Sequence, residues 1–278
     1  MNVLRGIALA FVALLLLAWV MGYGYREGWW VDELPAKTLA TDLAKSMRVF
    51  VPDGRGPFPT ILQFHGCGGS GPTQLSWAQV ARAAGYASII VDSYAHRGLD
   101  PADVCSGTAL LPSERAGDVL AVFTHAKTRP FVDPEHIVMA GWSHGASSIL
   151  ELLARNPPTE VPPNIEPDPS LGLEGLAGAV FFYPYCGFGI RASVWENDIP
   201  SLFLLAKEDS VAPPEPCIDL ADDADAAGQQ VTLRVFKGAD HAWDHTELGP
   251  ESRLFFSPEA TAASRDELLG FLASVAAS

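Results

Sequence analysis

HIVMAGWSHG, residues His136–Gly145, is the stretch of this chain that decides its fold. Its β-branched and apolar start predicts a strand, and the G-x-S-x-G pattern at its end predicts a sharp turn. The small and apolar residues Ala146–Leu153 then have the spacing of a helix. A serine at a strained strand-to-helix turn needs neighbours without side chains, so that the backbone can fold tightly and a substrate can approach. Ser143 is therefore a candidate catalytic nucleophile, with the positive end of a helix dipole directed at it.

Length and composition indicate one well-filled domain. The chain has 278 residues, of which 48% are hydrophobic and 18% are charged, and this fits a large α/β domain with an appendage. The formal net charge of −15 argues against a nucleic-acid partner, because phosphate binding needs clustered Lys and Arg side chains. Solubility is the simplest role for this acidity.

The N-terminus differs in kind from the rest of the chain. Gly6–Tyr25 is almost wholly apolar and uncharged, with Arg5 before it and Arg26 after it. About 20 such residues can span a bilayer as a helix. We favour an uncleaved signal anchor over a cleaved signal peptide, because the run is long and no clear cleavage site follows; a buried core helix ranks third. Trp29 and Trp30 resemble an aromatic belt at a membrane surface, and the positive-inside bias places everything after the helix outside the cytoplasm.

The chain accordingly divides into a signal anchor or signal peptide (1–25), a linker (26–42) and an α/β domain (43–278). Within the domain, strands alternate with helices and several strands are continuous apolar runs, which indicates a mostly parallel sheet covered on both faces. Ligands of such sheets bind beyond the carboxyl ends of the strands. The predicted strands are Lys45–Pro52, Thr60–Phe64, Ala87–Val91, the run before Gly141, Leu176–Tyr183, Ser201–Leu205 and Gln230–Phe236. The predicted helices are Leu75–Ala84, Leu111–Lys127, Ala146–Leu153, Pro216–Ala227 and Glu259–Val275, and Asn156–Gly172 is predicted to be an insertion loop.

A serine hydroxyl needs a base to take its proton, and that base needs an acid to orient it. His241 follows the last predicted strand and is the preferred base over His245. Asp209 follows the strand Ser201–Leu205 and is the preferred acid. The order serine, acid, histidine is that of the α/β-hydrolases. The alternative acids are Glu208, Asp240 and Asp244, of which the last two are expected to be solvated loop charges.

An oxyanion that develops at the reacting carbonyl needs two preorganised donors. One is the backbone N–H of His144, directly after the nucleophile. The other is expected from the glycine-rich loop that begins at His65, with the Cys67 N–H as first choice and the Gly68 N–H as second. His65 itself is expected to support the loop structurally.

These residues together resemble the dienelactone hydrolase family of α/β-hydrolases, from about Lys45 to the C-terminus. The resemblance implies an eight-stranded, mostly parallel hydrolase sheet with helices on both faces, and hydrolysis of esters or lactones without metal or cofactor. Ser143 stands where the family proper has a cysteine, which favours a general esterase over an enzyme for dienelactone. The motifs that carry the resemblance are Phe58-Pro59-Thr60, His65-Gly66-Cys67-Gly68, Val91-Asp92-Ser93-Tyr94, Gly141–Gly145, Tyr183-Pro184-Tyr185-Cys186 and Gly238–Trp243.

The same resemblance suggests further roles. Arg97 lies in a loop where the family can hold a substrate carboxylate, but a solvated or structural role is favoured over that one. Trp142 is a second candidate substrate-binding residue. Four cysteines in an exported domain suggest two disulfides, with four reduced, buried cysteines as the alternative. Neighbouring strands in this fold rank the pairs Cys67–Cys105 and Cys186–Cys217 first.

The resulting hypothesis is a serine hydrolase for carboxylic esters or lactones of small molecules, anchored to a membrane or secreted on the periplasmic side. No cofactor, metal or nucleic acid is expected, and a monomer is favoured. The alternatives are a peptidase or acyl transferase on the same fold, and a non-catalytic envelope binding protein.

Overall fold

A seven-stranded sheet forms the centre of the molecule, with strand order β1-β3-β2-β4-β5-β6-β7. The computed structural model describes residues 2–26, 28–191, 193–195, 198–249 and 251–276. Only β1 runs antiparallel to its neighbour, and the other pairs within this sheet are parallel. The strands are β1 (Arg48–Phe50), β2 (Phe58–Phe64), β3 (Ala87–Val91), β4 (Val132–Trp142), β5 (Leu176–Phe182), β6 (Ser201–Ala206) and β7 (Val231–Phe236).

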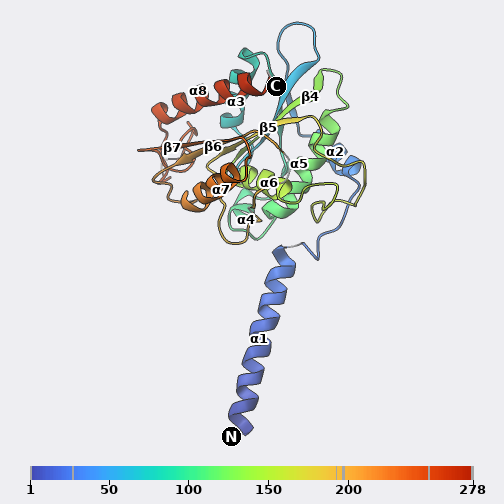
Figure 1. Cartoon of the computed structure of the whole chain (residues 1–278), viewed down its shortest axis with the longest axis vertical. Coiled ribbons are helices and arrows are strands. Elements are labelled where there is room, and N and C mark those ends of the chain that lie inside the picture. Colours follow the sequence, from blue (N-terminus) through green and yellow to red (C-terminus); the bar gives the residue numbers. More distant parts are fainter. Residues whose placement is uncertain (1, 27, 192, 196–197, 250, 277–278) are drawn as a thin grey trace.

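Helices cover both faces of the sheet, as the sequence predicts (Figure 1). α2, α5, α6 and α7 pack on one face, and α3 and α8 pack on the other. The central strands β3 and β6 are buried along their whole length, which explains why they are continuous apolar runs. The helices of the body are α2 (Ala36–Ala44), α3 (Pro72–Ala83), α4 (Pro101–Cys105), α5 (Pro112–Ala126), α6 (His144–Leu153), α7 (Glu215–Ala226) and α8 (Pro258–Val275). A 3₁₀ turn, η1 (Ala95–Arg97), and the short α4 were not predicted.

The sheet of the described residues differs from the predicted one at its start. The family resemblance implied eight strands, and the structure has seven, because the segment before β1 is the helix α2. Most of α2 also lies in the range 26–42 that was predicted to be a linker. Leu39, Ala40 and Leu43 are its buried face and belong to the same core as α5, so this part of the predicted linker is a helix of the domain.

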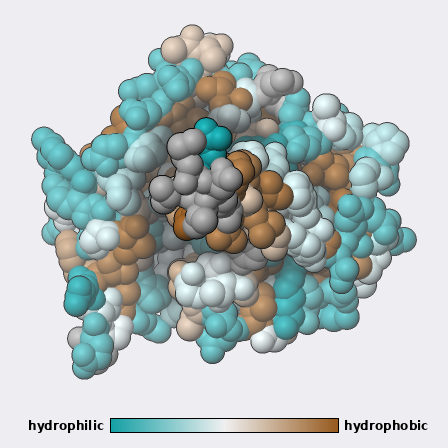
Figure 2. Space-filling view, turned by 90° about the horizontal axis from the view of Figure 1, so that it is seen from below, coloured by the Kyte–Doolittle hydropathy of each residue, from teal (hydrophilic) through white to brown (hydrophobic). Residues whose placement is uncertain are grey.

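α1 (Asn2–Arg26) extends away from the body of the molecule (Figure 1). Large apolar side chains such as Leu9, Phe11 and Trp19 are exposed on it. Seen from below in the orientation of Figure 1, the surface is largely hydrophilic, with hydrophobic patches scattered between the hydrophilic residues (Figure 2). Within the described part of the chain, no helix combines the length and the apolar character needed to cross a membrane. The signal anchor therefore stays a prediction.

The packing of α2 can be tested by a substitution. Leu43→Ala should lower the free energy of unfolding by about 2–4 kcal/mol, because it removes a fully buried side chain and leaves a cavity. Lys37→Ala, at an exposed position of the same helix, should change it by less than about 0.5 kcal/mol. Urea denaturation of both variants measures the difference, and equal stability would show that α2 is a detachable linker.

Candidate active site

The turn after β4 holds Ser143 in a strained conformation. Its φ of 50° lies in the left-handed region, which a residue with a side chain rarely adopts. The Ser143 N–H donates to the Phe182 carbonyl at 2.8 Å, and α6 begins at the next residue. A Cβ on Gly141 would collide with the backbone of Ala146, and a Cβ on Gly145 would collide with the Phe64 carbonyl. The glycines of the pattern are therefore required by close backbone approach, as the sequence predicts.

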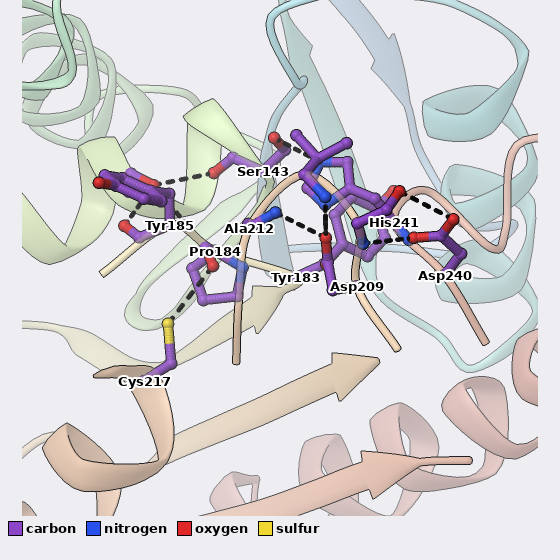
Figure 3. Close-up of polar contacts among 12 residues, drawn as sticks. Ser143, Tyr183, Pro184, Tyr185, Asp209, Ala212, Cys217, Asp240 and His241 are labelled. Atoms are coloured by element: carbon purple, nitrogen blue, oxygen red, sulfur yellow. Dashed lines mark hydrogen bonds and ion pairs between the residues drawn. The ribbon is translucent and has the colours of Figure 1, made fainter. Parts of the chain in front are cut away.

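Ser143, His241 and Asp209 form a continuous chain of hydrogen bonds (Figure 3). The distance from Ser143 Oγ to His241 Nε2 is 2.9 Å, and the distance from His241 Nδ1 to Asp209 Oδ2 is 2.8 Å. Because the Asp209 carboxylate accepts at Nδ1, the proton of a neutral imidazole lies there, and Nε2 can accept the serine proton. The three side chains follow β4, β6 and β7, which lie on the same side of the sheet with β5 between β4 and β6. The arrangement has the geometry of an activated nucleophile.

Further hydrogen bonds separate Asp209 from the alternative acids. Its Oδ1 accepts the N–H groups of Val211 and Ala212, so the carboxylate is held by its own loop. Glu208 turns outward and accepts the Gly238 N–H. Asp240 accepts the Ser210 N–H at 2.7 Å and the Ser210 hydroxyl at 2.9 Å, and it thereby ties the loop of His241 to the loop of Asp209. Asp209 is the carboxylate that contacts the His241 ring.

Three carbonyl groups of the glycine-rich loop after β2 accept hydrogen bonds from buried side chains. The His65 carbonyl accepts from Arg115 Nη1 at 2.7 Å, and the Gly66 carbonyl accepts from His65 Nδ1 at 2.7 Å. The Cys67 carbonyl accepts from the Tyr94 hydroxyl at 3.2 Å. His65 is fully buried, and burial holds its pKa well below the usual range, so it supports the loop as a neutral ring.

This orientation of the carbonyls determines where the N–H groups of the loop point. In a trans peptide the C=O group and the following N–H group point in opposite directions. The inward Gly66 and Cys67 carbonyls therefore leave the Cys67 and Gly68 N–H groups directed outward, in a loop that lines the same cavity as Ser143. The His144 N–H is the first free donor of α6. The role of these N–H groups as oxyanion donors stays a prediction.

The ring of His144 is held away from the role of a base. Its Nδ1 lies 3.2 Å from Arg115 Nη1, and since a guanidinium nitrogen can only donate, Nδ1 accepts. Burial, followed by the nearby charge of Arg115, lowers the pKa of His144 to about 3. His144 is therefore neutral at ordinary pH and contributes through its backbone.

Asp244 corrects the expectation of a solvated loop charge. It is only 4% exposed and accepts three hydrogen bonds, from Trp77 Nε1 at 2.7 Å, Trp142 Nε1 at 2.9 Å and the Tyr183 hydroxyl at 2.6 Å. The desolvation of burial raises the pKa of Asp244, although the three hydrogen bonds act to lower it. The Tyr183 ring also packs edge-on against His241, with ring centroids 4.8 Å apart. Asp244 thus joins α3, the ends of β4 and β5, and the loop of His241.

One feature of the sequence could have indicated this cluster. Trp77, Trp142 and Tyr183 stand in or next to predicted helices and strands, and their N–H and O–H groups need acceptors when they are buried. Trp142 lines the cavity, but its N–H group is occupied by Asp244. His245, the other histidine considered as a base, lies at the cavity together with Leu248 and Leu254.

Arg97 does not reach the cavity. Its guanidinium makes a bidentate ion pair with the fully buried Asp118, with distances of 2.7 and 3.0 Å, and donates to the Ser93 carbonyl. A bidentate pair of this kind occupies the donors that a substrate carboxylate would need. The structure therefore places Arg97 in a structural position, which was the favoured interpretation of the sequence.

Both predicted disulfides are confirmed. Cys67 is bonded to Cys105, and Cys186 is bonded to Cys217. The first bond links the glycine-rich loop to the end of α4 and lies at the cavity. The second links the loop after β5 to α7, directly after the segment that carries Asp209.

Ser143 lies at a cavity of about 280 Å³. Trp142, Tyr183 and His241 line it beside Ser143, and the glycine-rich loop lines another side. Among the described residues that line it, none is a Lys or an Arg. In the described part of the chain there is also no group of three or more His, Cys, Asp or Glu side chains arranged to hold a metal ion.

Comparisons with known proteins identify the fold. No protein-family model matches the chain, and no curated protein matches it. A proposed dienelactone hydrolase from Klebsiella pneumoniae superposes with a TM-score of 0.64 at 17% identity, covering 82% of this chain and 92% of that one. A thermophilic esterase from Thermogutta terrifontis with bound propionate gives 0.59 at 18%, covering 82% and 89%. A dienelactone hydrolase-like promiscuous phosphotriesterase from metagenomic libraries gives 0.61 at 15%, covering 82% and 92%. The chain therefore has the α/β-hydrolase fold.

Because the turn lies so close to β2, replacing Gly145 by Ala should affect stability very differently from replacing a glycine with open space around it. Gly145→Ala should lower the free energy of unfolding by about 1–3 kcal/mol, because the new Cβ would overlap the Phe64 carbonyl. Gly270→Ala, in α8 with open space around it, should raise stability by up to about 1 kcal/mol. Thermal unfolding compares the two, and a neutral Gly145→Ala would contradict the predicted overlap.

The disulfides predict a measurable loss of stability on reduction. Replacing both Cys186 and Cys217 by Ala should lower the free energy of unfolding by about 2–4 kcal/mol, since the bond closes a sequence separation of 31 residues. Mass spectrometry of the native protein after alkylation provides the control, because it should detect no reactive thiol before reductant is added.

Proposed function

We propose that this chain is a serine hydrolase of the dienelactone hydrolase family that cleaves carboxylic esters or lactones of small molecules. The observation that carries the proposal is the hydrogen-bond chain from Ser143 through His241 to Asp209, at 2.9 and 2.8 Å. It is supported by the fold, which the chain shares with an esterase and with dienelactone hydrolase-like proteins. Serine in place of the cysteine of the family favours a general esterase.

In the acylation step, Ser143 Oγ attacks the acyl carbon while His241 Nε2 takes the serine proton. The carbonyl oxygen becomes an anion that accepts from the His144 N–H and from the Cys67 or Gly68 N–H. Asp209 holds the ring of His241 and stabilises its charged form. The tetrahedral intermediate then collapses, the bond to the alcohol oxygen breaks, and His241 gives its proton to the leaving alcohol.

The second half of the reaction repeats these roles with water. His241 removes a proton from water, the hydroxyl oxygen attacks the acyl carbon of the Ser143 ester, and the oxyanion donors again stabilise the intermediate. When the intermediate collapses, the proton on His241 returns to Ser143 Oγ and the carboxylic acid leaves. A lactone follows the same path, with its alcohol still attached to the acid.

The cavity favours small substrates. Its volume of about 280 Å³ lies at the lower end of the range for small-molecule sites, and its lining is largely apolar. A peptidase or an acyl transferase on the same catalytic residues is the second candidate, and a non-catalytic envelope binding protein is the third. A binding protein has no need of a nucleophile, base and acid in mutual contact, and this ranks it last.

The location is proposed to be extracytoplasmic, on the periplasmic side, with the N-terminal segment (1–25) as an anchor or signal and the hydrolase domain at 43–278. The two disulfides support an oxidising compartment. The partners are small-molecule esters or lactones, with no nucleic acid and a monomer favoured.

Substitution of the nucleophile tests the proposal. Ser143→Ala should lower kcat for p-nitrophenyl acetate by at least about 10⁴-fold, since it removes the attacking oxygen. Ser274→Ala, a serine on α8 away from the cavity, should retain the wild-type rate. Labelling of the wild type, but not of Ser143→Ala, by a fluorophosphonate probe gives a second readout. Equal rates of Ser143→Ala and wild type would overturn the proposal, and hydrolysis of peptides in preference to esters would favour the second candidate.

A further inference from the structure

Two buried charges flank the site, and neither has an oppositely charged hydrogen-bond partner among the described residues. Arg115 on α5 is 0% exposed, and Asp244 after β7 is 4% exposed. Their hydrogen-bond partners are neutral groups. Asp118 and Asp92 favour the charged form of Arg115 through space, but neither hydrogen-bonds to it. A buried charge without a hydrogen-bonded counter-ion is costly, and such charges concentrate where function requires them.

Arg115 lies behind the proposed oxyanion donors. Nη1 donates to the His65 carbonyl at 2.7 Å and to His144 Nδ1 at 3.2 Å, and Nε donates to the Ser93 hydroxyl at 3.0 Å. Its Nη2 is buried with no hydrogen-bond partner. His65 begins the loop that carries the Cys67 N–H, and His144 supplies the second N–H. The guanidinium thus contacts His144, which supplies one proposed donor, and His65, which begins the loop that supplies the other.

Asp244 lies behind the proposed base. Indole N–H groups can only donate, and Trp77 and Trp142 both donate to Oδ2, which fits an ionised carboxylate. The Tyr183 hydroxyl donates to Oδ1, and the Tyr183 ring lies edge-on against His241. The negative charge is therefore separated from the imidazole by one aromatic ring.

The signs of these charges match the charge separation of the proposed reaction. In the transition state the substrate oxygen becomes negative and the imidazole of His241 becomes positive. We propose that Arg115 and Asp244 are positioning residues of opposite charge, whose combined field favours the oxyanion at one end of the site and the imidazolium at the other. In a buried site such a field is screened little and needs no reorganisation during the reaction. This inference rests on the proposed esterase activity.

None of the test variants replaces the other charged and titratable groups near His241. Asp209 from the loop after β6 contacts the ring, and Asp240 in the loop of His241 accepts its backbone N–H. The Tyr183 hydroxyl stays neutral, since burial raises its pKa well above the usual value. His245 lies at the same cavity. On the oxyanion side, His65 and His144 are neutral and Arg97 is paired with Asp118.

The test is the pH dependence of kcat/KM for p-nitrophenyl acetate in Asp244→Asn, Arg115→Met and Arg115→Lys. Loss of the negative charge should move the midpoint of the acidic limb to lower pH, because the imidazolium is less stabilised. Loss of the positive charge should move it to higher pH. We expect shifts of about 0.5–1 unit in opposite directions and a fall in kcat of about tenfold or more, with KM changed much less. Arg115→Lys should restore the wild-type midpoint.

Trp77→Phe and Ser93→Ala are matched controls, since each removes one neutral hydrogen bond from the cluster and keeps its charge. Their midpoints should equal that of the wild type, whatever their rates. If Arg115→Met fails to fold, Asp244→Asn carries the test, with thermal unfolding to show that this variant is folded. Unmoved midpoints in Asp244→Asn and in a folded Arg115→Met, or equally large shifts in the two controls, would overturn the inference while leaving the esterase proposal intact. An inactive wild type, or an active Ser143→Ala, would refute the esterase proposal and this inference with it.

Discussion

The contact between the turn at Ser143 and the end of β2 is the constraint on which the site depends. Gly145 lies so close to the Phe64 carbonyl that a Cβ there would overlap it, and Gly141 lies equally close to Ala146. This approach brings the start of α6 against the glycine-rich loop after β2. Ser143 and the backbone of two separate chain segments therefore share one cavity, and only residues without side chains permit this approach.

The parallel strand order brings the side chains of Asp209 and His241 to Ser143. β4, β5, β6 and β7 are neighbours in sequence order, so their carboxyl ends meet at one edge of the sheet. Ser143, Tyr183, Asp209 and His241 follow these strands in turn. Asp240 then holds the last two loops together through Ser210, and so the chain of hydrogen bonds does not depend on the nucleophile turn alone.

Local patterns explain how much of this could be predicted from the sequence. A strand, a G-x-S-x-G turn and a helix are encoded within neighbouring residues, and the order of acid and base follows from the order of strands. Asp244 could not be predicted, because its burial comes from Trp77 and Trp142, which lie 167 and 102 residues away in the chain. α2 was missed for another reason: its buried face is only three residues, Leu39, Ala40 and Leu43, within a nine-residue helix. The eighth strand was carried over from a resemblance that does not hold at the start of the domain.

The position of Arg97 limits what the site can recognise. Its sequence position suggested a carboxylate-binding role, but its guanidinium makes two hydrogen bonds to Asp118, a carboxylate with no exposed side-chain surface. Releasing Arg97 toward a substrate would leave that buried charge unpaired, and the cost of an unpaired buried carboxylate exceeds what one surface contact returns. Arg115, the other arginine nearby, is fully buried beneath the glycine-rich loop. Since no Lys or Arg is among the described residues that line the cavity, neither arginine is placed to bind a substrate carboxylate there.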